Sequence, residues 1–230
     1  SAPRGRQRRE AMSLGSIAAC AGNSVAQDMT RGVSQAIGKP LESLSGGASS
    51  RTPGHSEINW VEFNYPPLLR LIHYDLEELP TSLTGLVRCF NVSFQITAVA
   101  CALNLFDTAI IVMSTKAPPR WLLQSVLHLL LLPMAALGTF YSGYRGLAEP
   151  DSQLQFRFKM AQPFLAVVYF FFGLVPWGSC NGLAKLGSVQ DHTDGSVFWV
   201  VVIIFESILW WANAALAAWN VARAHHYESL

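Results

Sequence analysis

The residues best suited to chemistry in this 230-residue chain are polar side chains that interrupt long apolar runs. They are Asn104, Asp107, His128, Glu206 and Asn213. Ionisable groups in such runs are costly in a bilayer, so they usually face one another or a water-filled cavity. We therefore interpret the five as an intramembrane polar layer. A structural hydrogen-bond network is the favoured role, and proton transfer or ligand binding is the alternative.

The positions of these residues place them in the same half of a membrane. At a helical rise of about 1.5 Å per residue, Asp107 lies roughly 9 Å, His128 roughly 10 Å and Glu206 roughly 15 Å from one side. Asn104 precedes Asp107 by one turn, close to the depth of Glu206. We expect at least two of these four side chains to approach each other. Glu206 and Asn213 are seven residues apart, which places them nearly on one helix face.

Motifs of enzymes and metal sites are missing from the sequence. It has no Walker A loop, GxGxxG, HExxH or GxSxG pattern. The four cysteines form no CxxC pair, and the tail histidines His225 and His226 are typical of a solvated end. The net charge of +1 gives no support for a nucleic-acid partner. We predict a non-enzymatic protein without catalytic, cofactor or metal residues, in which bound lipids are the expected small molecules.

Four apolar runs separated by short polar connections predict the fold. Charged residues make up only 13% of the chain, about half of the average for globular proteins. The runs, at about 89–113, 121–141, 160–177 and 196–221, can each cross a hydrocarbon core of about 30 Å as a helix. The sequence thus predicts an all-α, membrane-embedded four-helix transmembrane bundle with an extended N-terminal segment.

The remaining segments differ in composition from the runs. Residues 1–58 have the composition of an N-terminal extension and linker, with a weak amphipathic helix at about 11–37. Residues 59–88, rich in aromatics and prolines, are predicted to lie at the membrane interface, and residues 222–230 form a short tail. The Arg-rich start after Ser1 is also found in transit peptides. A flexible basic tail is the favoured interpretation, and a processed presequence remains open.

A short polar bridge at residues 140–158 joins the second and third runs. It contributes to a candidate lipid-headgroup site made of Tyr141, Tyr144, Arg145, Arg157 and Lys159. Basic residues near anionic lipid each contribute about 1 kcal/mol. The alternative, of equal standing, is that these charges only fix the topology of the hairpin.

The distribution of basic residues predicts the orientation of the spans. Four spans place both termini and the central bridge on one side, and that side has more Arg and Lys. Its basic residues are Arg70, Arg88, Arg145, Arg157, Lys159 and Arg223, against Lys116, Arg120 and Lys185 on the other. We expect this side to face the cytosol or its equivalent.

Short motifs in a fixed order give the chain a family resemblance. Asn59-Trp60 precedes the pair Pro66-Pro67, and Tyr74-Asp75 is followed by Leu79-Pro80. The bridge opens with Phe140-Tyr141 and Tyr144, and contains Asp151-Ser152 and the run FRF at 156–158. The sequence WGSCNG at 177–182 closes the third run. Over about residues 59–221, this order resembles the secretory carrier membrane proteins, tetraspan proteins of vesicle membranes.

The resemblance implies a role in vesicle and membrane trafficking, or as a membrane scaffold. It also implies an endomembrane location and membrane lipids as partners. Two features depart from the family. The N-terminal segment has none of the Asn-Pro-Phe repeats that bind endocytic adaptors, and Ser142-Gly143 stands where an Arg-Pro pair is expected.

A second hypothesis is an accessory subunit of a large organellar membrane complex, respiratory or photosynthetic. Its N-terminal extension would wrap on partner subunits, and a bound pigment would be conceivable only in this case. A third hypothesis, a transporter or proton path, rests on the polar residues in the spans alone and is ranked last.

Overall fold

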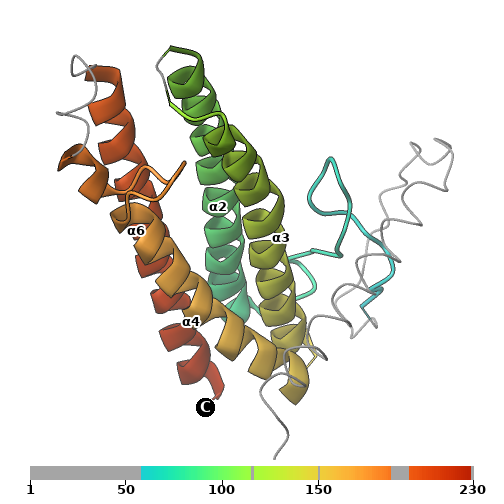
Figure 1. Cartoon of the computed structure of the whole chain (residues 1–230). Coiled ribbons are helices and arrows are strands. Elements are labelled where there is room, and N and C mark those ends of the chain that lie inside the picture. Colours follow the sequence, from blue (N-terminus) through green and yellow to red (C-terminus); the bar gives the residue numbers. More distant parts are fainter. Residues whose placement is uncertain (1–57, 115–116, 150, 188–196, 229–230) are drawn as a thin grey trace, which may run out of the picture. The chain divides into compact units, whose positions relative to one another are not determined.

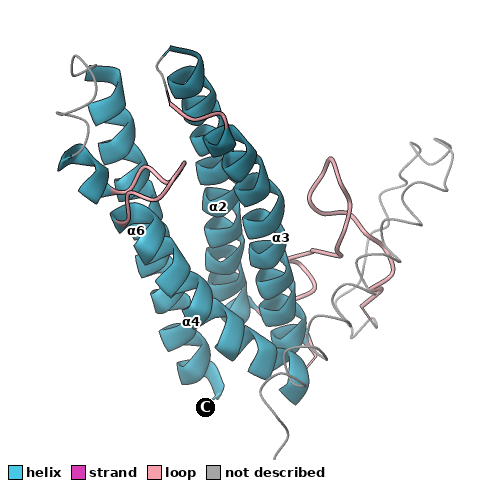
Figure 2. Cartoon of the chain, in the orientation of Figure 1, coloured by secondary structure: helices cyan, strands magenta, loops and turns pink. Residues whose placement is uncertain are grey.

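The structure is a computed structural model that describes residues 58–114, 117–149, 151–187 and 197–228. Four long helices dominate it: α2 (Thr81–Ser114), α3 (Arg120–Ala148), α4 (Ser152–Leu174) and α6 (Val197–Glu228). A short 3-10 helix, η1 (Leu183–Lys185), lies between α4 and α6. Figure 2 shows helices and loops but no strand in this part of the chain. The predicted all-α class is confirmed.

The four long helices form a closed ring of neighbours. α2 packs against α3 and α6, and α4 packs against the same two helices. Figure 1 shows the chain passing along the bundle in alternating directions. The start of α2, the turn between α3 and α4, and the end of α6 therefore lie at one end. The connection from α2 to α3 and residues 175–187 lie at the other.

Three of these helices are long and apolar enough to cross a membrane, by length and composition: α2, α3 and α6. α4 is different because Arg157 and Lys159 stand in its first two turns. Its apolar part, residues 160–174, reaches only roughly 22 Å at about 1.5 Å per residue. The bundle thus combines three long apolar helices with one that is polar at its N-terminal end.

The helices extend beyond the predicted spans at the end that holds the α3–α4 turn. α2 begins at Thr81 rather than near residue 89, and α6 continues to Glu228 rather than 221. The polar bridge predicted at 140–158 is almost entirely helical, because α3 continues to Ala148 and α4 begins at Ser152. Helix bounds and span bounds are different quantities, since a helix can leave the hydrocarbon core and continue through the interface.

The tight turn between α3 and α4 has two local causes. Asp151 is the N-cap of α4, and its Oδ1 accepts a hydrogen bond from the Gln153 backbone N–H at 2.8 Å. Gly143 lets the helices approach closely. A Cβ at this position would lie 2.6 Å from Phe158 and 2.9 Å from Phe90, whose rings pack with centroids 4.5 Å apart.

Residues 58–75 belong to a separate compact unit and are described by themselves. Tyr65 and Ile72 form an isolated antiparallel bridge. The Asn64 side chain braces it, since Oδ1 accepts from the Tyr74 N–H at 2.8 Å and Nδ2 donates to the Tyr74 carbonyl at 3.1 Å. The segment therefore folds back on itself. The helix predicted at about 11–37 lies outside the described residues.

Residues 175–187 turn back into the bundle instead of leaving it. α4 ends at Leu174, just before Pro176, which disfavours helical backbone at the residue ahead of it. The chain returns so closely that a Cβ at Gly182 would meet the Leu174 carbonyl carbon and lie 2.5 and 2.6 Å from Val175 N and O. Only glycine fits at this crossing.

We expect Gly182→Ala to destabilise the bundle by about 1–3 kcal/mol, because backbone atoms cannot yield to the added methyl group. The measurement is thermal unfolding of the purified protein in detergent. Gly187→Ala is the matched control, since a Cβ there meets nothing within 4 Å. Equal melting temperatures for the two variants would contradict the close crossing.

Candidate functional site

A seam of hydrogen bonds joins α2 and α6 inside the bundle. Glu206, Asn213 and Asn220 follow one another at seven-residue intervals on α6, and all three are 0% exposed. Each bonds to α2. The Asn104 Nδ2 donates to Glu206 Oε2 at 3.0 Å, and the Asn220 Nδ2 donates to the Cys89 carbonyl at 3.3 Å. These three residues therefore form a polar stripe on α6 that faces α2, and the two helices are antiparallel.

The middle of the seam also includes α4. Asn213 accepts at Oδ1 from the Ser93 hydroxyl at 2.8 Å and donates through Nδ2 to the Thr97 hydroxyl at 2.9 Å. The Thr97 and Tyr169 hydroxyls are 2.8 Å apart. These four side chains are buried, so their hydrogen bonds connect three helices at one depth.

The Glu206 layer is the candidate site. The second carboxyl oxygen of Glu206, Oε1, accepts from Asn181 Nδ2 at 3.0 Å. The carboxyl group of Asp107 lies within hydrogen-bonding reach of Glu206. On the other side, Lys185 Nζ donates to Asn181 Oδ1 at 3.0 Å and to the Gly178 carbonyl at 3.0 Å. One amide thus connects a buried ammonium to a buried pair of acids.

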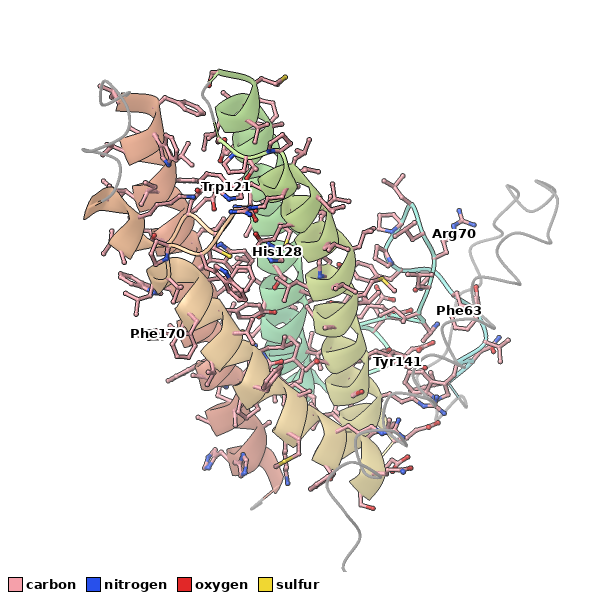
Figure 3. The ribbon with its side chains drawn as sticks, viewed as in Figure 1. Phe63, Arg70, Trp121, His128, Tyr141 and Phe170 are labelled. Carbon is pink, nitrogen blue, oxygen red and sulfur yellow. The ribbon has the colours of Figure 1, made fainter. Side chains whose placement is uncertain are left out.

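Lys185 belongs to the connection after α4, yet it is only 4% exposed. Its Nζ lies 4.3 Å from the centroid of the Trp121 ring and 5.6 Å from that of Trp199, which favours the cation. Figure 3 labels Trp121 at the start of α3. Burial lowers the pKa of Lys185 from its ordinary value of 10.5 to about 8, against the opposing effects of Cys180 and Glu206.

The backbone of the connection also takes its partners from this layer. The Ser179 carbonyl accepts from Asn104 Nδ2 at 2.8 Å, and the Ser179 N–H donates to Gln124 Oε1 at 3.2 Å. Burial raises the pKa of the neighbouring Cys180 thiol to about 12, lowered in part by Lys185. Cys180 is therefore a neutral thiol at physiological pH.

The structure brings together some of the predicted polar residues and separates others. Asn104, Asp107 and Glu206 meet in one layer, whereas Asn213 lies in the next layer along α6. His128 has a different neighbour, because its ring packs edge-on against Phe172 with centroids 4.9 Å apart. Figure 3 labels His128 in the first third of α3.

The predicted lipid-headgroup residues all lie in helices rather than in a loop. Tyr141, Tyr144 and Arg145 are in the last turns of α3, while Arg157 and Lys159 are in the first turns of α4. Tyr144 is buried and stacks on Phe140, so its side chain packs within the bundle. Arg145 donates to the Tyr141 hydroxyl at 3.3 Å and pairs with Glu149 at 3.6 Å.

Sequence reasoning missed Ser179, Asn181 and Lys185. It placed residues 178–195 outside the membrane, so Lys185 was counted only as a topological charge. A signal was present, since the run WGSCNG at 177–182 had no explanation other than family resemblance. This run of small and polar residues lies in the same chain as two spans that each contain an acid. It could therefore have been assigned to the Glu206 layer.

The chemistry of the site is that of hydrogen bonding and charge balance. Among the described residues, no group of three or more His, Cys, Asp or Glu is placed to hold a metal ion. Asp107, Glu206 and Lys185 are the charged side chains of the layer. They are positioned to bind the connection after α4, and their chemistry also suits a proton or a small ion.

Comparison with known proteins assigns the chain to a family. A family model described as the SCAMP family matches residues 62–230, which include all four long helices. The chain belongs to the SCAMP family. No curated protein and no solved structure matches it.

Membership confirms the predicted resemblance and makes this a membrane protein of the SCAMP type. The matched range contains the Glu206 layer and the α3–α4 turn, so both are built on the family's own scaffold. The whole of the N-terminal extension, residues 1–58, lies outside that range.

Lys185 predicts how the stability of this SCAMP-family chain depends on pH. Below pH 8 the ammonium is charged in the folded and unfolded states, and its burial cost applies in full. Between pH 8 and 10.5 the folded protein loses this proton first, so stability rises by on the order of 2–3 kcal/mol. We expect melting curves in detergent to show this rise relative to Lys185→Met.

The matched control is Lys159→Met, which removes a half-buried lysine of α4. It should leave the difference between pH 8 and pH 10 as in the wild type. A wild-type protein that follows Lys185→Met at every pH would contradict the buried ammonium.

Proposed function

We propose that this SCAMP-family protein is a non-enzymatic four-span scaffold of vesicle membranes that acts in membrane trafficking. The observation that carries the proposal is the family match over residues 62–230. The interior of the bundle supports the scaffold role, because its polar side chains bond to one another and so hold the helices together.

The distribution of charge supports a cytosolic position for the end with the α3–α4 turn. The basic residues at this end are Arg88, Arg145, Arg157, Lys159 and Arg223. The opposite end has Arg120 and the buried Lys185 among the described residues. Positive charges flanking spans remain on the cytosolic side, so the end of α6 should also face the cytosol.

The same end is suited to anionic lipid. Arg157 and Lys159 are partly exposed in the first turns of α4, where long basic side chains can extend from apolar surface to headgroups. Arg145 adds a third charge, although Glu149 offsets part of it. Phosphatidylserine and similar lipids are the partners that this chemistry recognises.

Localisation tests the trafficking role. A full-length chain tagged after Leu230 should fractionate with vesicle and endomembrane markers, and its tag should be reached by antibody once the plasma membrane alone is permeabilised. Detergent extracts run on native gels should show a small species. A sharp band of very high mass in an organellar fraction would instead support the accessory-subunit hypothesis and overturn this one.

A second prediction concerns lipid. In native mass spectrometry after exchange into phosphatidylcholine–phosphatidylserine vesicles, replacing Arg145, Arg157 and Lys159 by Gln should reduce retained phosphatidylserine at least tenfold. This follows from about 1 kcal/mol for each basic residue near such a surface. Arg120→Gln, at the other end of α3, is the control and should retain it. Unchanged retention in the triple variant would limit these charges to a topological role.

A further inference from the structure

The charges of the Glu206 layer do not balance. Asp107 and Glu206 adjoin each other, and the Asn181 amide connects Lys185 to Glu206. Two carboxylates and one ammonium leave one negative charge inside the bundle. An uncompensated buried charge is very costly, so the layer requires one more positive charge, which can be a proton shared between the two acids or a bound cation.

Three oxygen atoms of the same layer lack hydrogen-bond partners among the described residues. They are Asn104 Oδ1, Thr108 Oγ1 and Ser179 Oγ. Their residues are only 4%, 2% and 1% exposed, respectively. Buried polar atoms are nearly always paired in native proteins, so these oxygens indicate a ligand that accepts lone pairs or donates hydrogen.

These oxygens belong to residues that lie beside the acid pair. Asn104, Asp107 and Thr108 are spaced i, i+3 and i+4, so they share one buried face of α2. Asn104 also holds Ser179, because its Nδ2 donates to the Ser179 carbonyl at 2.8 Å. The same amide nitrogen donates to Glu206, so Asn104 Oδ1 belongs to the acid layer itself.

The end of α4 adds a favourable field for a cation beside the acids. α4 ends at Leu174 and the chain continues in non-helical backbone beside the acids. The carbonyl end of a helix carries partial negative charge, which favours a cation nearby. Carboxylate, amide and hydroxyl oxygens are the ligands that such hard cations prefer.

We propose that Asp107 and Glu206, together with oxygens of Asn104, Thr108 and Ser179, bind one small monovalent cation inside the bundle. Its single charge neutralises the layer, and its coordination occupies the three unpaired oxygens. The bound ion would fix the connection after α4 against α2 and α6.

The test is thermal unfolding of the full-length protein in detergent, titrated with NaCl or KCl at constant ionic strength maintained with choline chloride. Binding to the folded state alone predicts a melting temperature that rises with the logarithm of the ion concentration once that concentration exceeds the dissociation constant. Above half-saturation we expect roughly 3–5 °C for each tenfold increase in the bound ion. The rise should be absent in Asp107→Asn, which preserves the shape of the side chain and removes its charge.

Thr108→Val provides a second variant, because it removes one oxygen ligand with little change in volume. It should shift the titration to higher ion concentrations. Thr139→Val is its matched control, since the Thr139 hydroxyl already donates to the Ala135 carbonyl on α3, and its titration should follow the wild type. A wild-type melting temperature that is the same in Na⁺, K⁺ and choline would overturn the proposal and leave a shared proton between the acids as the compensating charge.

Discussion

The α2–α6 seam is the interaction on which the rest of the bundle depends. Lipid tails are as apolar as leucine, so burial of apolar surface cannot select how two spanning helices align. Hydrogen bonds between the helices can select one alignment, because a shift of one residue along the helix would break all of them. From Glu206 to Asn213 to Asn220, that is toward the C-terminus of α6, the bonded partners lie progressively nearer to the N-terminus of α2. Three bonded layers therefore fix both the register and the antiparallel direction of this pair.

The polar residues at one end of the seam also have a structural task. Non-helical backbone is tolerated at membrane depth only where protein groups satisfy it. The connection after α4 meets this condition through three donors or acceptors from outside its own backbone. Asn104 donates to the Ser179 carbonyl, Gln124 accepts from the Ser179 N–H, and Lys185 donates to the Gly178 carbonyl. Removing these side chains would leave buried peptide groups unpaired, which costs about 1–3 kcal/mol each.

Hydropathy and helical spacing were sufficient to predict the four helices and the shared face of Glu206 and Asn213, while the order of short motifs predicted the family. Helix bounds differ from the predicted spans around 140–158, because hydropathy reports on lipid contact, whereas a helix continues wherever its side chains pack, as Phe158 does on Phe90. Lys185 could not be found by hydropathy either. A lysine in a Gly-rich connection has the pattern of a solvated residue, and only the return of the chain at Gly182 buries it.

The short apolar length of α4 connects these observations. Three long helices can cross the hydrocarbon core unaided, but the apolar part of α4 falls short of about 30 Å. The connection beyond Leu174 completes that depth with irregular backbone, and irregular backbone requires polar partners. This requirement explains why the Glu206 layer lies in the half of the bundle where α4 ends. It also explains why ionisable side chains gather in that layer. Lys185 belongs to the connection, which turns back into the bundle, and it therefore lies near the acids of α2 and α6.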